Sequence, residues 1–369
     1  MTTVHAAMRT GYRRIEVTQS ADRDTIPATS HAAPALDGRQ LECVAVHPDA
    51  PRRVFVGTFE SGVWRSTDGG ETFERLDGVA RGDEATGPQA VMSLAVAPDD
   101  PETVWLGTEP SRVFVSRDGG ETWDRRGGLT DLDSASEWSF PPRPHTHHVR
   151  WLEPDPADAD HWYVAVEAGA LVQTDDGGVT WRDRVPGSRR DTHSIATHPD
   201  APGRAWVAAG DGFAETHDGG ATWHHPQRGL DRTYCWSVAV DAADPSRVLV
   251  SAARSAREAH TASRAETYVY RREEGGDGSV DRDSDASPAD GTGSRSAAAW
   301  ERLDESRLPV GEGVTRPVLA RGSTEGLFFA LSNRGLWRTT DGGDSWWEVG
   351  VDWPDRVETQ TARGLAVLG

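Results

Sequence analysis

The sequence predicts an all-β fold, a seven-bladed β-propeller built from four-stranded antiparallel blades. Two observations predict it. A short turn pattern recurs along the chain, and each copy lies between segments in which hydrophobic and polar residues alternate. The two ends of the chain also hold complementary parts of one more unit, so the C-terminal strand is expected to pair with the N-terminal blade. Such pairing closes the ring of blades and removes its open edges.

The recurring pattern is Ser/Thr-x-Asp-Gly-Gly-x-Thr/Ser followed by an aromatic residue. Its Asp-Gly-Gly core is a turn signal, because aspartate bonds the backbone ahead of it and glycine accepts a positive φ. Each copy is expected to join the third and fourth strands of a blade, so its aspartate is interpreted as structural rather than catalytic. These aspartates are Asp68, Asp118, Asp176, Asp218 and Asp341.

Each copy of the pattern closes a longer unit of four short strands. In the first complete unit the strands are expected at residues 41–48, 54–58, 62–65 and 72–76. The same layout begins again near residues 91, 147, 192, 235 and 315. The unit that starts near residue 235 lacks the pattern and carries a polar stretch between its third and fourth strands. Residues 273–298 are therefore predicted to be a disordered acidic insertion.

The ends of the chain supply the remaining blade. Residues 4–8 and 12–17 have the pattern of second and third strands, and residues 362–367 have the pattern of a first strand. The outer strand of this blade is expected within residues 20–36. The prediction is a single domain over residues 1–369, with blade 1 formed by 1–38 and 357–369 and blades 2 to 7 by about 39–356.

These repeats resemble the Asp-box (BNR) repeats of sialidases, sortilin-type receptors, photosystem assembly factors and several glycoside hydrolases. The resemblance extends over nearly the whole chain at the level of repeats, and it implies a propeller. It implies little about activity, because these families share the blade and differ in chemistry. The Arg-Ile-Pro signature near the N-terminus of sialidases is absent here, and Arg14, Ile15 and Glu16 are the nearest match.

The chain is strongly acidic, since 59 Asp and Glu residues against 39 basic residues, all of them arginine, give a net charge of −20. This composition resembles that of halophilic proteins, whose dense carboxylates keep the surface hydrated in strong salt. An ordinary acidic protein from a GC-rich genome is the alternative. Without a basic stripe or a long apolar run, we expect no nucleic-acid binding and no membrane span. Cys43 and Cys235 are expected to be free thiols, and the protein a cytoplasmic monomer.

The candidate site lies on the face opposite the turn patterns, at the mouth of the ring. Aligned by blade, the second residues of the first strands are large and mostly polar: Glu42, Met92, His148, His193, Trp236, Arg316 and Arg363. The loops after the second strands add Glu60, Glu109, Glu167 and Asp211 on blades 2 to 5, and Arg254, Arg334 and Arg9 on blades 6, 7 and 1. Acids and histidines are thus predicted on one side of the mouth and arginines on the other. Pairing of these charges across the ring is the alternative interpretation.

A long loop over residues 124–148 leads into blade 4, and its prolines and aromatic residues predict a stiff, packed cover. It brings histidines near other residues of metal-ligand type. The set is His145, His147, His148, Glu167, Asp191 and His193. Neighbouring His147 and His148 point in opposite directions on a strand, so one of them at most joins a given site. A divalent metal held by His145, His147 and His193 is one hypothesis, and hydrogen-bonded histidines in an acidic pocket without a cofactor are the other.

Three functions fit these features. In the first, the mouth binds an anionic small molecule or a segment of a partner protein, because arginines hold carboxylates and phosphates through paired hydrogen bonds. In the second, the protein is a glycoside hydrolase, with Glu109 and Glu167 as acid and base and Trp236 or Tyr234 stacking on a sugar. In the third, it is a structural interaction scaffold. Binding is the preferred interpretation, because the sialidase signature is missing.

Overall fold

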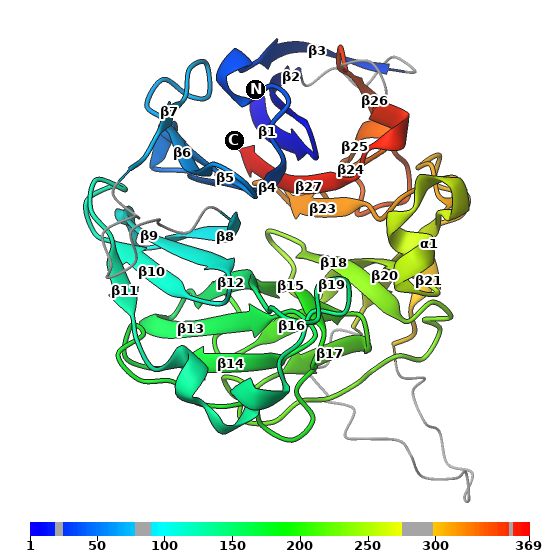
Figure 1. Ribbon diagram of the computed structural model, residues 1–369. Helices are drawn as coiled ribbons and strands as arrows, with labels where there is room; N and C mark the ends of the chain where they lie inside the picture. The colour runs from blue at the N-terminus through cyan, green and yellow to red at the C-terminus, as the bar shows by residue number, and fades with distance from the viewer. Residues whose placement is uncertain (19–24, 78–89, 275–297, 354–356) are drawn as a thin grey trace, which may run out of the picture.

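The computed structural model describes residues 1–18, 25–77, 90–274, 298–353 and 357–369 of the chain. It confirms the all-β propeller, since antiparallel sheets stand around a common centre (Figure 1). The predicted insertion over residues 273–298 lies almost entirely outside the described residues. No helix among the described residues is long and apolar enough to cross a membrane.

Two sheets have four strands each. They are β4 (Leu41–His47), β5 (Ala50–Thr58), β6 (Gly62–Ser66) and β7 (Glu74–Arg75), then β8 (Ala90–Ala97), β9 (Asp100–Glu109), β10 (Val113–Ser116) and β11 (Asp124–Arg126). Two sheets have three strands, β12 (Val149–Asp155), β13 (Asp158–Val166) and β14 (Ala170–Thr174), then β15 (Thr192–Thr197), β16 (Ala205–Ala209) and β17 (Gly212–Thr216). A five-stranded sheet holds β18 (Tyr234–Val240), β19 (Arg247–Ala253), β20 (Glu266–Glu273), β21 (Glu301–Arg302) and β22 (Gly311–Glu312).

The largest sheet has eight strands and contains both ends of the chain. In spatial order it runs β23 (Val318–Arg321), β24 (Phe328–Ser332), β25 (Gly335–Thr339), β26 (Trp347–Gly350), β3 (Thr25–Ala32), β2 (Gly11–Val17), β1 (Thr2–Met8) and β27 (Ala362–Leu368). The antiparallel pairing of β1 with β27 confirms the predicted closure of the ring. The parallel pairing of β26 with β3 was not predicted, and it joins two four-stranded units into one sheet. The number of blades therefore stays a prediction.

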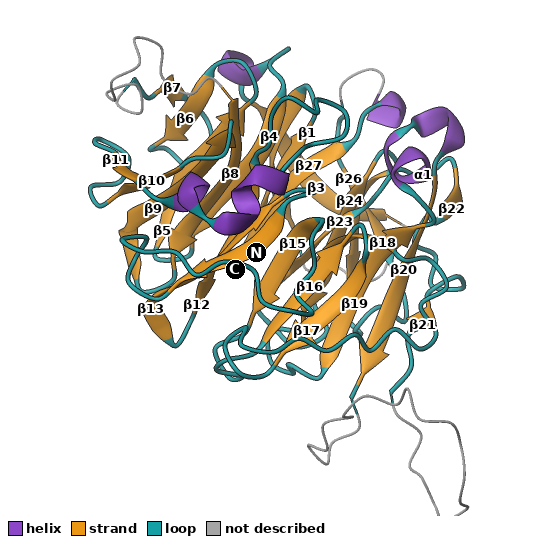
Figure 2. Ribbon diagram, turned by 60° about the horizontal axis from the view of Figure 1, so that its bottom comes forward, coloured by secondary structure: helices purple, strands orange, loops and turns teal. Residues whose placement is uncertain are grey.

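The first strands of successive units contact one another in a closed cycle that runs β4, β8, β12, β15, β18, β23, β27 and back to β4. Hydrophobic side chains fill the space between neighbouring sheets, as where Trp105 stacks on Trp162 with 4.3 Å between the ring centroids. Helical segments are short. They are α1 (Ala256–His260) and 3-10 turns at Pro34–Leu36, Leu129–Asp131, Asp133–Glu137, Ala262–Arg264 and Val357–Thr359. Figure 2 shows them (purple) gathered along the upper part of the molecule.

In two units the predicted fourth strand is reduced to a single bridge, Gln173 with Arg182 and Glu215 with His224. The reasons lie in the following residues. After Arg182, the carboxylate of Asp183 accepts hydrogen bonds from the backbone N–H and the hydroxyl of Ser134, which turns the chain away from the sheet. After His224, the sequence reaches Pro226 within two residues, and proline has no N–H for a ladder.

The turn pattern forms the predicted structural turn, as the copy around Asp118 illustrates. The Ser116 hydroxyl donates to Asp118 Oδ1 at 2.7 Å and accepts the Gly120 N–H at 2.8 Å. Asp118 Oδ1 also accepts the N–H of Thr122 at 2.8 Å, and Asp118 Oδ2 accepts its hydroxyl at 2.5 Å. Gly119 and Gly120 have φ values of 66° and 92°, which explains the two glycines. The carboxylates at Asp68, Asp176, Asp218 and Asp341 also accept the N–H four residues ahead.

We expect Ser116→Ala to lower the free energy of unfolding by about 1–3 kcal/mol, because the buried N–H of Gly120 would lose its acceptor. Chemical denaturation of the purified protein measures this change. Ser136→Ala is the matched control, since Ser136 is exposed and its hydroxyl makes one bond of 3.3 Å to a backbone carbonyl. Equal stability of the two variants would contradict the structural role of the pattern.

Candidate functional site

A β-bulge near the start of the first strands decides which side chains face the mouth. In β4 the register with β5 shifts between Leu41 and Cys43, so Glu42 is left out of the pairing. The same shift occurs in β8, β12, β15 and β18, and where β27 pairs with β1. The residues left out of the pairing there are Met92, Arg150, His193, Trp236 and Arg363. Bulges re-aim side chains and are common beside functional sites.

The bulges correct the predicted register of blade 4. The aligned sequence placed His148 at the position of Glu42 and Trp236, whereas the structure places Arg150 there, two residues later. The sequence alignment began this strand at His147, whereas the strand begins at Val149. With the corrected register, Arg150 and Arg363 hold equivalent bulge positions in two blades, and Arg316 lies two residues before β23.

The mouth contains a cavity of about 200 Å³. It is lined by Arg9, Gln40, Glu42, Phe59, Met92, Phe140, Pro142, Arg143, His148, Arg150, Glu167, Trp236, His260 and Arg363. Four of these are arginines and two are glutamates, although the whole chain has a net charge of −20. Seven of the predicted mouth residues are therefore brought together: Arg9, Glu42, Met92, His148, Glu167, Trp236 and Arg363.

Arginines gather around the Trp236 ring. The guanidinium carbon of Arg316 lies 3.5 Å from the ring centroid and that of Arg150 lies 4.8 Å from it. Arg316 is 1 % exposed, and its Nε and Nη1 have no hydrogen-bond partner among the described residues. Burial, and then the charges of Arg363 and Arg150, hold the pKa of Arg316 well below its usual value. Positive charge is thus concentrated here beyond what the neighbouring carboxylates neutralise.

Two glutamates face these arginines from the lining. Glu42 Oε2 accepts a hydrogen bond from Arg363 Nη1 at 3.0 Å, while the buried Nε of Arg363 has no partner among the described residues. Glu167 Oε2 lies 2.9 Å from His148 Nε2 and 3.6 Å from Arg150 Nε. Burial alone would raise the pKa of Glu167, but the hydrogen bond from His148 and the nearby positive charges bring it below the usual range.

The loop before β12 covers the cavity as a packed segment. Arg143 donates to both carboxylate oxygens of Glu109, at 2.7 and 2.5 Å, and its guanidinium lies over the rings of Phe59 and Phe140. Phe140 also packs edge-on against His148, with 4.7 Å between ring centroids. Glu109 therefore anchors the loop, and the paired bonds occupy both of its oxygens.

A chain of hydrogen bonds runs behind the cavity. His193 Nδ1 lies 2.6 Å from the backbone oxygen of Cys235, and this contact makes Nδ1 the donor. The Tyr234 hydroxyl lies 3.3 Å from His193 Nε2 and 3.1 Å from His260 Nε2. Burial, and then the charge of Arg316, lower the pKa of His260 to about 2, so the ring is neutral, and in the tautomer with its proton on Nδ1 its Nε2 accepts a hydrogen bond from the Tyr234 hydroxyl.

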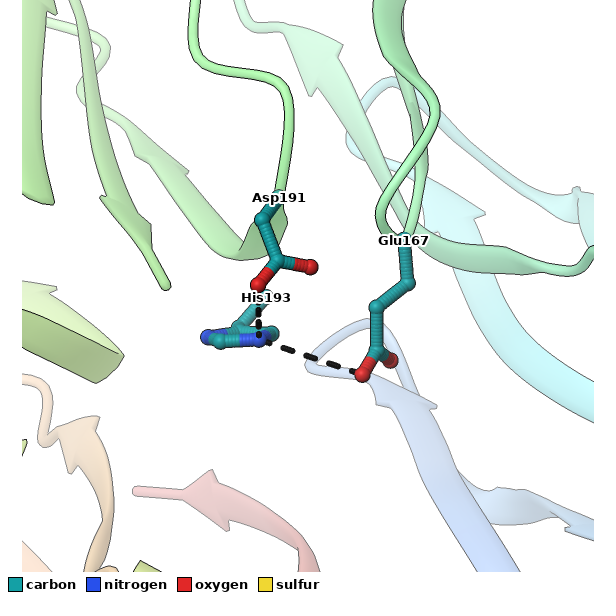
Figure 3. Close-up of side chains that lie close together, drawn as sticks. All are labelled: Glu167, Asp191 and His193. Carbon is teal, nitrogen blue, oxygen red and sulfur yellow. Dashed lines mark ion pairs between the residues drawn. The ribbon is translucent and has the colours of Figure 1, made fainter. Parts of the chain in front are cut away.

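Figure 3 shows Glu167 and Asp191 approaching the same ring nitrogen of His193. Asp191 Oδ2 lies 3.7 Å and Glu167 Oε1 3.8 Å from His193 Nε2. Burial, together with the charge of Glu167, raises the pKa of Asp191, because two carboxylates here disfavour each other's ionisation. This group takes in His193, one of the predicted metal ligands, but neither His145 nor His147.

Several predicted residues lie outside the cavity lining. Arg254 and Arg334 are exposed, and beside the second of them the buried Asn333 makes three hydrogen bonds. Glu60 accepts a bond from Gln40, and Asp211 from the backbone of Arg190. His145 is exposed and His147 packs edge-on against Trp138. Glu109, His193 and Arg316 lie behind the lining.

Sequence reasoning missed Arg143, Arg150 and His260 as residues of the cavity. Arg150 carried a signal, because it was the polar exception among aliphatic residues at its aligned position. Arg143 and His260 carried none, since their places depend on how the long loop and α1 fold over the mouth.

The comparisons with known proteins support the fold. The BNR/Asp-box repeat family matches residues 114–125, around Asp118. No curated protein matches the chain by sequence. Among solved structures, the GH74 xyloglucanase from Xanthomonas campestris has a TM-score of 0.62 and 17% identity, over 94% of this chain and 53% of that one. The GH74 enzyme from Niastella koreensis has a TM-score of 0.59 and 15% identity, over 94% and 55%.

A shorter protein is also similar. YCF48 bound to D1 peptide has a TM-score of 0.54 and 14% identity, over 84% of this chain and 81% of that one. The chain thus spans about half the length of the two GH74 structures and most of the length of YCF48. At these identities the likeness shows the propeller fold alone.

We expect acid to destabilise the protein through His260. Its pKa falls from 6.5 to about 2 on folding, so stability is complete above pH 6.5 and declines as the pH drops from there toward the folded value. This histidine contributes a slope of about 1.4 kcal/mol per pH unit. His260→Gln, which keeps an acceptor for Tyr234, is expected to reduce the loss of stability between pH 7 and 5. Denaturation at several pH values measures it, with His31→Gln as the exposed control; an unchanged slope in His260→Gln would contradict the expectation.

Proposed function

We propose that the cavity at the mouth of this Asp-box β-propeller binds an anionic group. That group is a carboxylate or phosphate, carried by a small molecule or by a segment of a partner protein. The observation that carries the proposal is the group of arginines at the cavity, since Arg9, Arg150 and Arg363 line it and Arg316 lies behind the lining on the face of Trp236.

Electrostatics supports this choice over a neutral ligand. A buried charge is costly unless it is paired, and Nε and Nη1 of the buried Arg316 have no partner among the residues that the structure describes. An anion beside Arg150 and Arg363 offsets part of the repulsion among these guanidinium groups. It also offers acceptors to the arginines of the lining, and hydrogen bonds between charged groups are stronger than those between neutral ones.

The structure of YCF48 bound to D1 peptide supports the version in which the anion belongs to a protein segment, since that protein is a similar propeller. A cavity of about 200 Å³ accommodates one small anion or a single acidic side chain rather than a long ligand. A longer segment therefore places only its acidic end inside the cavity, and the rest lies on the rim.

Glycoside hydrolysis is the second candidate, and the two GH74 structures favour it. The arrangement of carboxylates speaks against it. Arg143 occupies both oxygens of Glu109, and the lowered pKa of Glu167 is unsuited to a general acid near neutral pH. Turnover of chromogenic glycosides that is abolished by Glu167→Gln would reverse this ranking.

The test is a binding experiment in low and in high salt. Phosphate, citrate and a short peptide that ends in two aspartates are titrated by calorimetry, and we expect at least one of them to bind. Arg9→Met and Arg150→Met are each expected to weaken binding about 10- to 100-fold, the value of one or two charge-assisted bonds. Thermal stability is expected to rise with ligand concentration in parallel.

Arg334→Met is the matched control, because Arg334 is exposed near the same face and does not line the cavity. Its binding is expected to equal that of the unaltered protein. If Arg334→Met weakens binding as much as Arg150→Met, the interaction is a general surface effect and the proposal fails. Absence of binding by every probe in both salts contradicts it as well.

A further inference from the structure

We propose that Glu167, Asp191 and His193 form a site for one divalent transition-metal ion behind the arginine cavity. The ligands are Glu167 Oε1, Asp191 Oδ2 and His193 Nε2, which all lie within 4.8 Å of one another (Figure 3). They come from two successive blades, since Glu167 follows β13, Asp191 precedes β15 and His193 lies in β15. The inference goes beyond anion binding and uses different atoms.

Each of the three side chains has a second polar atom that points away from the proposed ion and makes a hydrogen bond. His193 Nδ1 donates to the carbonyl of Cys235 at 2.6 Å, which leaves Nε2 with a free lone pair in the neutral ring. Asp191 Oδ1 accepts the N–H of Ala168 at 2.9 Å, and Glu167 Oε2 bonds to His148 Nε2 at 2.9 Å. Outer hydrogen bonds of this kind orient metal ligands, and here all three ligands have one.

The distances suit a metal after a small closure. Ligand atoms that share an ion at about 2.1 Å lie no more than about 4.2 Å apart. His193 Nε2 is 3.7 Å from the Asp191 oxygen and 3.8 Å from the Glu167 oxygen, so both pairs already meet this limit. The third pair, the Glu167 and Asp191 oxygens, lies within 4.8 Å. The Asp191 side chain is 30% exposed, and a rotation of this side chain brings its oxygen closer to that of Glu167. The same exposure provides the path by which an ion enters.

Tyr234 accommodates the change at His193. Its hydroxyl lies 3.3 Å from His193 Nε2, and it has an alternative acceptor at 3.1 Å in His260 Nε2. When an ion takes the His193 lone pair, the tyrosine proton stays bonded to His260 and no buried donor loses its partner.

The donor set indicates which ions bind. One imidazole nitrogen and two carboxylate oxygens suit Zn²⁺, Co²⁺ and Mn²⁺, whereas Ca²⁺ prefers six or more oxygens and Cu⁺ prefers sulfur. Two carboxylates and a neutral imidazole also balance the charge of a divalent ion. The three ligands leave open positions for water or for a ligand atom.

The test uses the full-length protein after treatment with a chelator, in high salt so that surface carboxylates are screened. Co²⁺ is titrated and its visible absorption recorded, and Mn²⁺ binding is measured by electron paramagnetic resonance. We expect one ion per chain and a Co²⁺ spectrum that reports nitrogen and oxygen ligands. Asp191→Asn is expected to weaken binding at least about 100-fold, because it removes a charged ligand.

Asp211→Asn is the matched control, since Asp211 is a nearby acid whose carboxylate lies outside the group. Its affinity for Co²⁺ is expected to be unchanged. His193→Gln removes the nitrogen ligand. Because His193 is fully buried, this variant can fail to fold, and in that case Asp191→Asn alone tests the site. Arg9→Met is expected to bind Co²⁺ normally, so failure of the metal site and failure of anion binding are distinguishable. Equal affinity in Asp191→Asn and Asp211→Asn, or no stoichiometric binding at all, overturns the proposal.

Discussion

In successive first strands, a β-bulge takes one residue out of the backbone pairing and turns its side chain toward the mouth. The residues around it alternate between the spaces on either side of the sheet and are committed to packing. Chemistry is therefore concentrated in a ring with one variable position per blade. The bulge separates packing between the sheets from the choice of side chain at the mouth. The blade keeps its core while residues as different as Glu42, Trp236 and Arg363 occupy the bulge position.

The ring tolerates buried charge because its members support one another. The paired bonds between Arg143 and Glu109 fix the covering loop, and the bond between Arg363 and Glu42 neutralises one arginine of the lining. Arg316 lies on the face of Trp236, at 3.5 Å from the ring centroid, and this contact is weaker than an ion pair in a dry site. At the opposite end of the blades, hydrogen-bonded turns such as that of Asp118 stabilise the strands. This stabilisation offsets the unfavourable free energy of the buried charges at the mouth.

The sequence predicted the features that depend on local periodicity. The turn at Asp118, the four-strand unit and the pairing of β1 with β27 were all readable, because alternation and turn chemistry determine them. The bulges were not predicted, but the position that they turn toward the mouth was, except in blade 4, where the first strand was expected to begin at His147 and begins at Val149. The parallel contact of β26 with β3 and the inward turn of His260 were not predictable. They depend on contacts between segments far apart in the chain, which leave no local pattern.

Glu167 connects the two proposed sites. Its Oε2 faces His148 and Arg150 on the cavity side, and its Oε1 faces His193 on the other side. A cation at Oε1 draws negative charge away from Arg150, which leaves that guanidinium freer to hold an anion. An anion beside Arg150 in turn leaves more of the Glu167 charge for the cation. Were both proposed sites occupied, binding at either would strengthen binding at the other by the same factor, since coupling between two binding equilibria is reciprocal. Glu167 is thus the side chain through which the proposed anion site and the proposed cation site would be coupled.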